Sequence, residues 1–213
     1  MLKSVKWHQD LLVQQTKDAL EKNGFLVEIC ETKEECLKSA IAQIDKDMII
    51  GLGGSTTTKE IGLFDYLIKN NYNLINPYVP GLSREEVFNI RQKTLTADYF
   101  ITSSNAVTLE GEFVNIDGFG NRVSGIIFGP KKVFLFIGMN KIVHNREQAI
   151  DRILDYAAPI NAKRLERDVP CIQSGSCEDC DSPERICNHL VISMKQNITD
   201  RIKIFLIKDN LGF

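Results

Sequence analysis

The sequence lacks any apolar run that approaches the roughly 20 residues needed to span a bilayer. Its first residues, Met1-Leu2-Lys3-Ser4, lead into a polar helical pattern rather than the apolar core of a signal peptide. We therefore expect a cytoplasmic protein with no membrane span. In that reducing compartment, clustered cysteines favour a metal or redox site over a disulfide framework.

An excess of either charge is also missing. The chain carries 26 basic and 28 acidic residues, a formal net charge of −2, and both signs are spread along its length. Such a balance provides no polybasic surface for nucleic acid or anionic lipid. We expect small molecules or other proteins as partners.

Histidine is scarce, since the chain has only His8, His144 and His189. None of them accompanies a serine elbow motif, so the sequence offers no Ser-His-Asp triad. It also contains no internal repeat and no low-complexity tract.

What the sequence does contain is enough apolar residues, 43% of 213, for one compact α/β domain over residues 1–213. Short apolar runs alternate with amphipathic segments, as in parallel βαβ units, whose ligands gather at the carboxyl ends of the strands. The predicted strands are 25–30, 47–51, 73–76, 98–103, 132–139, 190–194 and 202–207, with a hairpin over 107–109 and 112–116. The predicted helices are 5–23, 32–44, 57–68, 83–97, 123–127 and 146–158. Thr32 with Glu35, and Ser83 with Glu86, match the pattern of a capping box.

Three segments of the chain resemble a known family. Residues 97–106, 111–122 and 133–143 are similar to parts of the lactate-utilization (LUD) domain, the LutC/YkgG family, and the resemblance covers residues 5–160. Its most distinctive parts are Asn115-Ile116-Asp117-Gly118 with Asn121-Arg122, and Gly138-Met139-Asn140-Lys141-Ile142-Val143. The resemblance implies a parallel-centred mixed α/β sheet flanked by helices, like that of ribose-5-phosphate isomerase A and the coenzyme A transferases. It also implies a role in L-lactate oxidation, beside redox partner subunits that carry iron–sulfur clusters.

A glycine-rich loop over residues 51–58 joins the second predicted strand to its helix. It is not a Walker loop, because Lys59 stands five residues beyond Gly54, and not a dinucleotide turn, because Thr56 stands where glycine is needed. Backbone N–H groups and hydroxyls in such a loop can bind an anion. The alternative is a capped turn without a ligand, since such turns use the same residues. The residues predicted to bind the anionic group are Gly53, Gly54, Ser55, Thr56 and Thr57.

A second group of polar residues, Glu110, Asp117, Asn121 and Arg122, lies at the hairpin tip and in the glycine loop that follows it. An arginine can hold a carboxylate such as lactate through two hydrogen bonds. The coenzyme A transferases use a glutamate as nucleophile. We therefore treat Glu110, Asp117 and Arg122 as candidate catalytic residues and Asn121 as a candidate ligand-binding residue. The alternative makes Glu110 a solvated turn residue and Asp117-Gly118 ordinary turn chemistry.

Four cysteines, Cys171, Cys177, Cys180 and Cys187, lie within 17 residues, inside a cysteine-rich loop that we assign to residues 161–189. Thiolates at this density, with one C-x-x-C pair, can converge on one metal ion or cluster. We favour a [4Fe–4S] cluster because of the redox setting that the resemblance implies. Zinc is the first alternative and a reversible disulfide the second, and His189 could replace one thiolate. The remaining cysteines, Cys30 and Cys36, fit small core positions.

The sequence therefore predicts a LUD-like protein of lactate or 2-hydroxy acid use. It would bind a small anionic metabolite at the glycine loop and carry a four-cysteine site for redox chemistry or structure. One alternative is a non-redox sugar-phosphate isomerase or a coenzyme A or acyl transferase, with Glu110 or Asp117 catalytic and a structural cysteine site. The other is a redox-sensing or assembly subunit without catalysis.

Overall fold

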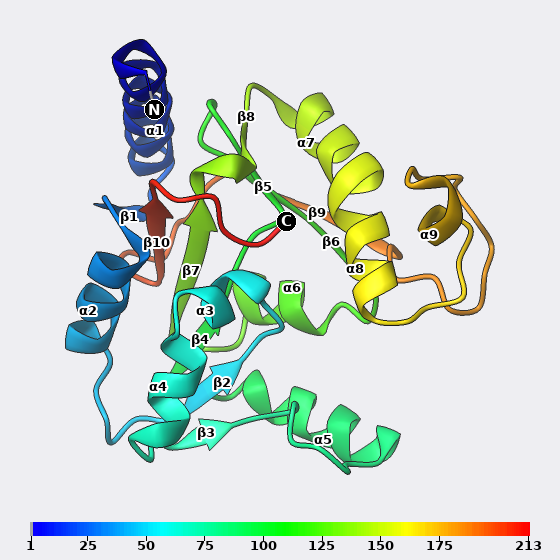
Figure 1. The fold of residues 1–213 in the computed structure, drawn as a ribbon. Coiled ribbons are helices and arrows are strands. Elements are labelled where there is room, and N and C mark those ends of the chain that lie inside the picture. Colours follow the sequence, from blue (N-terminus) through cyan, green and yellow to red (C-terminus); the bar gives the residue numbers. More distant parts are fainter. Residues whose placement is uncertain (1) are drawn as a thin grey trace.

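Two sheets organise the computed structural model, which describes residues 2–213 (Figure 1). The larger sheet has six strands, and every neighbouring pair in it runs parallel. Its strands in spatial order are β1 (Leu26–Cys30), β10 (Ile202–Ile207), β7 (Lys132–Gly138), β4 (Tyr99–Thr102), β2 (Ile50–Leu52) and β3 (Leu74–Ile75). The last strand in sequence, β10, thus lies inside the sheet, between the edge strand β1 and β7.

The smaller sheet is mixed. Its strands in spatial order are β8 (Ile142–Val143), β5 (Ala106–Thr108), β6 (Phe113–Asp117) and β9 (His189–Ser193). The pairs β5–β6 and β6–β9 are antiparallel, whereas β5 and β8 run parallel. The predicted hairpin is therefore present, and β9, the first strand after the cysteines, forms one edge of this sheet.

Helices cover both faces of the large sheet. The helical segments are α1 (Lys3–Lys22), α2 (Lys33–Gln43), α3 (Thr56–Glu60), α4 (Leu63–Lys69), α5 (Arg84–Thr94), α6 (Asn121–Ile127), the 3₁₀ turn η1 (Met139–Lys141), α7 (Arg146–Arg152), the π-helical η2 (Ile153–Ala157), α8 (Ala158–Arg164) and α9 (Cys171–Ser174). None of them, within residues 2–213, has the length and apolar character that a bilayer crossing demands. Segments α7, η2 and α8 follow one another without a break. Pro159, the second residue of α8, has no N–H to donate, and the wider π turn ends two residues before it.

The core lies in two layers on either side of the large sheet. On β7, Phe134 and Phe136 pack into the layer under α2 and α4, whereas Val133, Leu135 and Ile137 pack into the layer shared by α1, α6 and the small sheet. Successive side chains of a strand point to opposite faces, so a strand covered on both sides must be apolar throughout. The continuous apolar run predicted for this strand is explained by its central place, and the predicted α/β fold is confirmed.

Three local predictions need correction. At Thr32 only half of a capping box forms, because the Glu35 carboxylate accepts from the N–H of Glu31 instead of that of Thr32; the box at Ser83 is complete. The second strand begins at Ile50 rather than Asp47, since the side chain of Asp45 accepts from the N–H of Asp47 in a turn. The helix after the glycine loop is split by Gly62 at φ 76°, in the left-handed region open to glycine.

The strand order brings several chain turns together at one edge of the large sheet. Strands β2, β4 and β7 are parallel, so their carboxyl ends, and the loops that leave them, meet at the same edge. These loops are the glycine loop after β2, the Ser103–Asn105 turn after β4 and η1 after β7. A site built there draws on residues that are far apart in sequence.

Candidate functional site

A cavity of about 410 Å³ opens at this edge. Its walls include the glycine loop, α5, the ends of β4 and β6, the start of α6, η1, the end of α8 and part of the cysteine segment. Only two acidic side chains, those of Asp117 and Glu184, line it among the described residues. Its seven cationic side chains are Arg84, Arg91, Arg122, Lys141, Arg164, Arg167 and Arg185. The cavity is therefore strongly cationic, although the whole chain is not.

The glycine loop forms one wall of this cavity. Gly54, Ser55 and Thr56 line it, while Gly53 is buried behind them and donates its N–H to the carbonyl of Ile101 at 2.9 Å. Any side chain on Gly53 would come within 2.8 Å of β4 atoms, so the close approach of the loop to β4 requires glycine. Ser55 also caps α3, because its hydroxyl accepts from the N–H of Thr58 at 3.1 Å. The loop therefore caps α3 and also forms a cavity wall, so the cap does not decide between the capped turn and the anion site.

Thr57, the last predicted ligand residue of the loop, is buried and contacts a lysine instead of lining the cavity. Its Oγ1 accepts from Nζ of Lys141 at 2.9 Å. The Lys141 ammonium also donates to Oγ of Ser103 at 3.1 Å and to the carbonyl of Ser104 at 3.3 Å. Lys141 is only 3% exposed, yet its side chain borders the cavity.

Lys141 is the main residue that sequence reasoning missed. Within residues 2–213 it forms no ion pair with a carboxylate. Burial, reinforced by the nearby positive charges of Arg152 and Arg122 and opposed by Glu60, lowers the pKa of Lys141 from 10.5 to about 7. A lysine placed directly after the most apolar strand of the chain is the signal that could have identified it.

Arg122 lies beside the cavity with its donors already used. One terminal nitrogen donates to the carbonyl of Ser103 at 3.1 Å and to Oδ1 of Asn115. The other donates to Oδ1 of Asn105 and to the carbonyl of Ile116, both at 2.9 Å. Together with the Asp117 contact described below, these bonds employ every N–H of the guanidinium. Arg122 therefore joins the ends of β4 and β6. To bind a substrate carboxylate through two hydrogen bonds, it would have to break some of these contacts.

Asp117, a candidate catalytic residue, and Asn121, a candidate ligand-binding residue, both line the cavity. The Asp117 Oδ1 accepts from the N–H of Gly120 at 2.8 Å, and its Oδ2 lies 3.2 Å from Nε of Arg122. Both oxygens of Asp117 are thus engaged in holding the turn between β6 and α6. Asn121 begins α6 at the same turn.

Two other arginines of the cavity offer donors that the protein does not use. Nε of Arg91 and Nε of Arg167 are buried and have no hydrogen-bond partner within residues 2–213. The guanidinium of Arg91 lies over the ring of Phe119, 5.1 Å from its centroid. Buried donors are nearly always satisfied in proteins, so these two donors are available to an acceptor from outside the chain.

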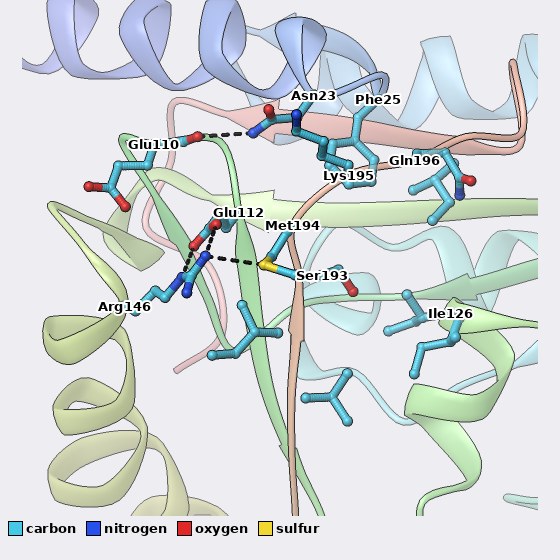
Figure 2. Close-up of a pocket in the computed structure, with 14 residues that line it drawn as sticks. Asn23, Phe25, Glu110, Glu112, Ile126, Arg146, Ser193, Met194, Lys195 and Gln196 are labelled. Carbon is cyan, nitrogen blue, oxygen red and sulfur yellow. Dashed lines mark hydrogen bonds and ion pairs between the residues drawn. The ribbon is translucent and has the colours of Figure 1, made fainter.

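Glu110 lies elsewhere, in a second cavity of about 620 Å³ that Figure 2 shows in close-up. The contact drawn there for Glu110 is through its backbone carbonyl, which accepts from the side chain of Asn23 at 3.0 Å. Deeper in this cavity, Glu112 forms a two-point ion pair with Arg146. Glu110 precedes β6 and Asp117 ends it, and a five-residue strand spans about 15 Å. The structure therefore separates Glu110 from the other predicted residues of its group.

The cysteine segment packs against the cationic cavity. Pro183, Glu184, Arg185 and Ile186 line the cavity, and the side chain of Asn188 donates to the carbonyl of Gly118 at 3.1 Å. Figure 1 shows this segment beyond the outer side of α8. The two regions that the sequence singled out for chemistry therefore meet at one place.

The four cysteines are free and partly buried. Arg185 holds the segment together, donating to the carbonyls of Cys180 and Cys187 at 2.7 and 3.2 Å. Burial, and next the neighbouring thiols Cys180, Cys187 and Cys177, raise the pKa of Cys171. Within residues 2–213, however, no three His, Cys, Asp or Glu side chains are close enough to share a metal ion. The donor chemistry fits a thiolate centre, whereas the present spacing of the thiols does not form one.

The fold and the sequence are both similar to known proteins. The chain is similar over 93% of its length to the crystal structure of a DUF162 family protein from Deinococcus radiodurans, of which it covers 98%, with a TM-score of 0.54 and 13% identity. At that identity the likeness concerns the fold alone. No curated protein matches the chain. The model of the LUD domain matches residues 13–207, well past residue 160 where the resemblance was expected to end, and so includes the cysteine segment. The chain belongs to the LUD domain family.

Proposed function

We propose that the cationic cavity binds a small anionic metabolite, a carboxylate or a phosphate, in the use of lactate or another 2-hydroxy acid. The observation that carries this proposal is the pair of buried, unpartnered donors on Arg91 and Arg167. Both arginines line a cavity whose other described side chains include five further cations and two acidic residues. A charged hydrogen bond to an anion would satisfy both donors and offset the crowding of positive charge.

The dimensions of the cavity agree with a small ligand. Its volume of about 410 Å³ lies within the range of metabolite sites. Gly54, Ser55 and Thr56 add backbone and hydroxyl donors on the wall formed by the glycine loop. Membership of the LUD domain family supports a role in lactate utilization, and the LutC/YkgG type of that family and a cytoplasmic location are part of the proposal.

Calorimetric titration of L-lactate, pyruvate and inorganic phosphate tests this function. We expect at least one of them to bind, and the double variant Arg91→Gln, Arg167→Gln to bind it at least about 10-fold more weakly, since each charged hydrogen bond contributes about 1.5–3 kcal/mol. Lys93→Gln with Lys163→Gln is the matched control, because it removes the same charge from the same two parts of the chain at exposed positions. Equal weakening in both double variants would show a nonspecific charge effect and contradict the proposed site.

For the cysteine segment we propose a [4Fe–4S] cluster held by Cys171, Cys177, Cys180 and Cys187, with zinc as the alternative. The support is the donor set itself, four neighbouring free thiols on a segment held by Arg185. Binding would draw the thiols closer together than they lie in this structure. The group would supply electron transfer if it is a cluster and only rigidity if it is zinc. We further propose that residues 1–213 form one domain, because β10 lies between β1 and β7.

The alternative enzymes proposed from sequence receive less support from this geometry. Glu110 lines the other cavity, and both oxygens of Asp117 are held by the turn that they stabilise. A glutamate nucleophile would have to face the ligand within hydrogen-bonding distance. The cationic cavity instead presents Lys141 as its nucleophilic or basic group.

A further inference from the structure

Lys141 borders the cationic cavity at the carboxyl end of β7, the central strand of the molecule. We propose that its side-chain amine adds to the carbonyl group of an anionic substrate, and that the substrate class is a 2-oxo acid. This inference rests on the proposed anion site, because the carboxylate of such a substrate would be held by that site. Nothing in the family match or in the similar structure assigns this residue a role.

The first support is the setting of the amine. Lys141 is 3% exposed, has no carboxylate ion-pair partner within residues 2–213, and borders a cavity rather than closed core. The charged groups that face it are Arg122 of α6, Arg152 of α7 and Glu60 of α3. Two cations against one anion disfavour the ammonium form and favour the neutral amine, which is the form that attacks carbonyl carbon.

The second support is the pair of hydroxyls on Nζ. Oγ1 of Thr57 lies 2.9 Å and Oγ of Ser103 lies 3.1 Å from the nitrogen. A carboxylate partner would fix the lysine as a charged structural group. Hydroxyls can both accept and donate, so they stay hydrogen-bonded to Nζ in either protonation state. They can also receive and return the protons that addition and loss of water require.

The reaction balances without an oxidant or a metal. The nitrogen lone pair forms a bond to the carbonyl carbon, the π electrons move to the carbonyl oxygen, and one proton passes from nitrogen to that oxygen. Loss of a second proton from nitrogen together with the hydroxyl group releases water and leaves a C=N bond. The substrate carboxylate stays unchanged and is available to the cationic wall, which includes Arg91 and Arg167.

The test is reductive trapping on the wild-type protein. Pyruvate is the 2-oxo acid probe, and L-lactate, which has a hydroxyl group in place of the ketone, is its matched control. Sodium borohydride converts a C=N adduct into a stable secondary amine, which peptide mass spectrometry assigns to a residue. We expect one adduct with pyruvate, on Lys141, with a yield that rises from about pH 6 to about pH 8 as the amine loses its proton. We expect no adduct with L-lactate and none in Lys141→Arg.

The outcomes separate this inference from the proposed function. If pyruvate and L-lactate both raise the melting temperature but no adduct forms on Lys141, the lysine chemistry is wrong and the anion site stands. If pyruvate, L-lactate and inorganic phosphate all leave the melting temperature unchanged and no adduct forms, both proposals fail. Adducts spread over exposed lysines such as Lys132 as much as on Lys141 also overturn the inference. Because the mapping uses the wild-type chain, it remains decisive even if Lys141→Arg folds poorly.

Discussion

Lys141 and Arg122 are cations beside one cavity, and their partners differ in kind. Arg122 donates to carbonyl and amide oxygens and contacts one carboxylate, so its charge is permanent and its position fixed. Lys141 donates to two hydroxyls and one carbonyl, and its pKa is lowered to about 7. The guanidinium therefore serves to hold the strand ends, whereas the lysine can change its protonation near neutral pH.

The lowered pKa of Lys141 predicts a pH-dependent stability. Below about pH 7, Lys141 is charged in both the folded and the unfolded state, and its buried charge destabilises the fold. Between about pH 7 and the unfolded-state pKa of 10.5, only the unfolded state keeps the proton. Stability therefore rises with pH across that interval. In urea unfolding, wild type should gain about 2 kcal/mol relative to Lys141→Met between about pH 7 and about pH 9. Lys132→Met, at the exposed start of β7, should show no such gain. Parallel pH profiles of stability for wild type and Lys141→Met would contradict the lowered pKa of Lys141.

Arg122→Lys should destabilise the protein even though charge is kept. An ammonium cannot reach the four acceptors and the carboxylate that the guanidinium joins, so buried oxygens of Asn105, Asn115 and Ile116 lose a donor. We expect a loss of about 2–4 kcal/mol in the free energy of unfolding measured with urea. Arg164→Lys is the control, since Arg164 is exposed and contacts Asn161 of its own helix. A loss below about 0.5 kcal/mol for Arg122→Lys would mean that the hydrogen bonds of Arg122 do not stabilise the fold.

At the scale of elements, the glycine loop combines a tight packing position with an open one. A Cβ on Gly53 would lie 2.7 Å from Cβ of Thr102 and 2.8 Å from the ring of Phe100, whereas one on Gly54 would meet first the hydroxyl of Tyr78, at the free end of a side chain. Gly53→Ala should therefore cost about 1–3 kcal/mol of stability in urea unfolding.

Gly54→Ala is the companion variant. It should leave the free energy of unfolding within about 1 kcal/mol of wild type, because the tyrosine can move. The added methyl group would project into the cavity that Gly54 lines, so ligand binding in the calorimeter should weaken. If Gly54→Ala binds phosphate and 2-oxo acids as wild type does, the loop is a capped turn and not part of the ligand site.

The cysteine segment makes a prediction of its own. Protein isolated without oxygen should contain iron and acid-labile sulfide and absorb broadly near about 400 nm if a cluster is bound. Cys177→Ser and Cys180→Ser should lose the metal, while Cys30→Ala, in the core, should keep it. Colourless protein with one zinc per chain would contradict the cluster and support the zinc alternative. Wild-type protein without any metal would contradict both. Because residues 183–186 line the cationic cavity, removing the metal should also weaken ligand binding.

At the scale of the whole molecule, the sequence predicted the elements well where one local pattern was sufficient. The apolar run of β7 and the complete capping box at Ser83 depend on adjacent residues, and both are confirmed. Lys141 could not be found in this way, because its hydroxyl partners lie 84 and 38 residues away and converge on it only through the order of parallel strands. Glu110 was grouped with Asp117 because the two are close in sequence. The grouping failed because they lie at opposite ends of one strand, β6.

The central claim is that the cationic cavity is the ligand site, and a crystal structure with pyruvate at the saturating concentration found by titration tests it most directly. The account predicts ligand density beside Thr56, with its carboxylate within hydrogen-bonding distance of Nε of Arg91 or Arg167 and its carbonyl carbon next to Nζ of Lys141. Density in the cavity beside Glu110, with the cationic cavity free of ligand, would contradict it.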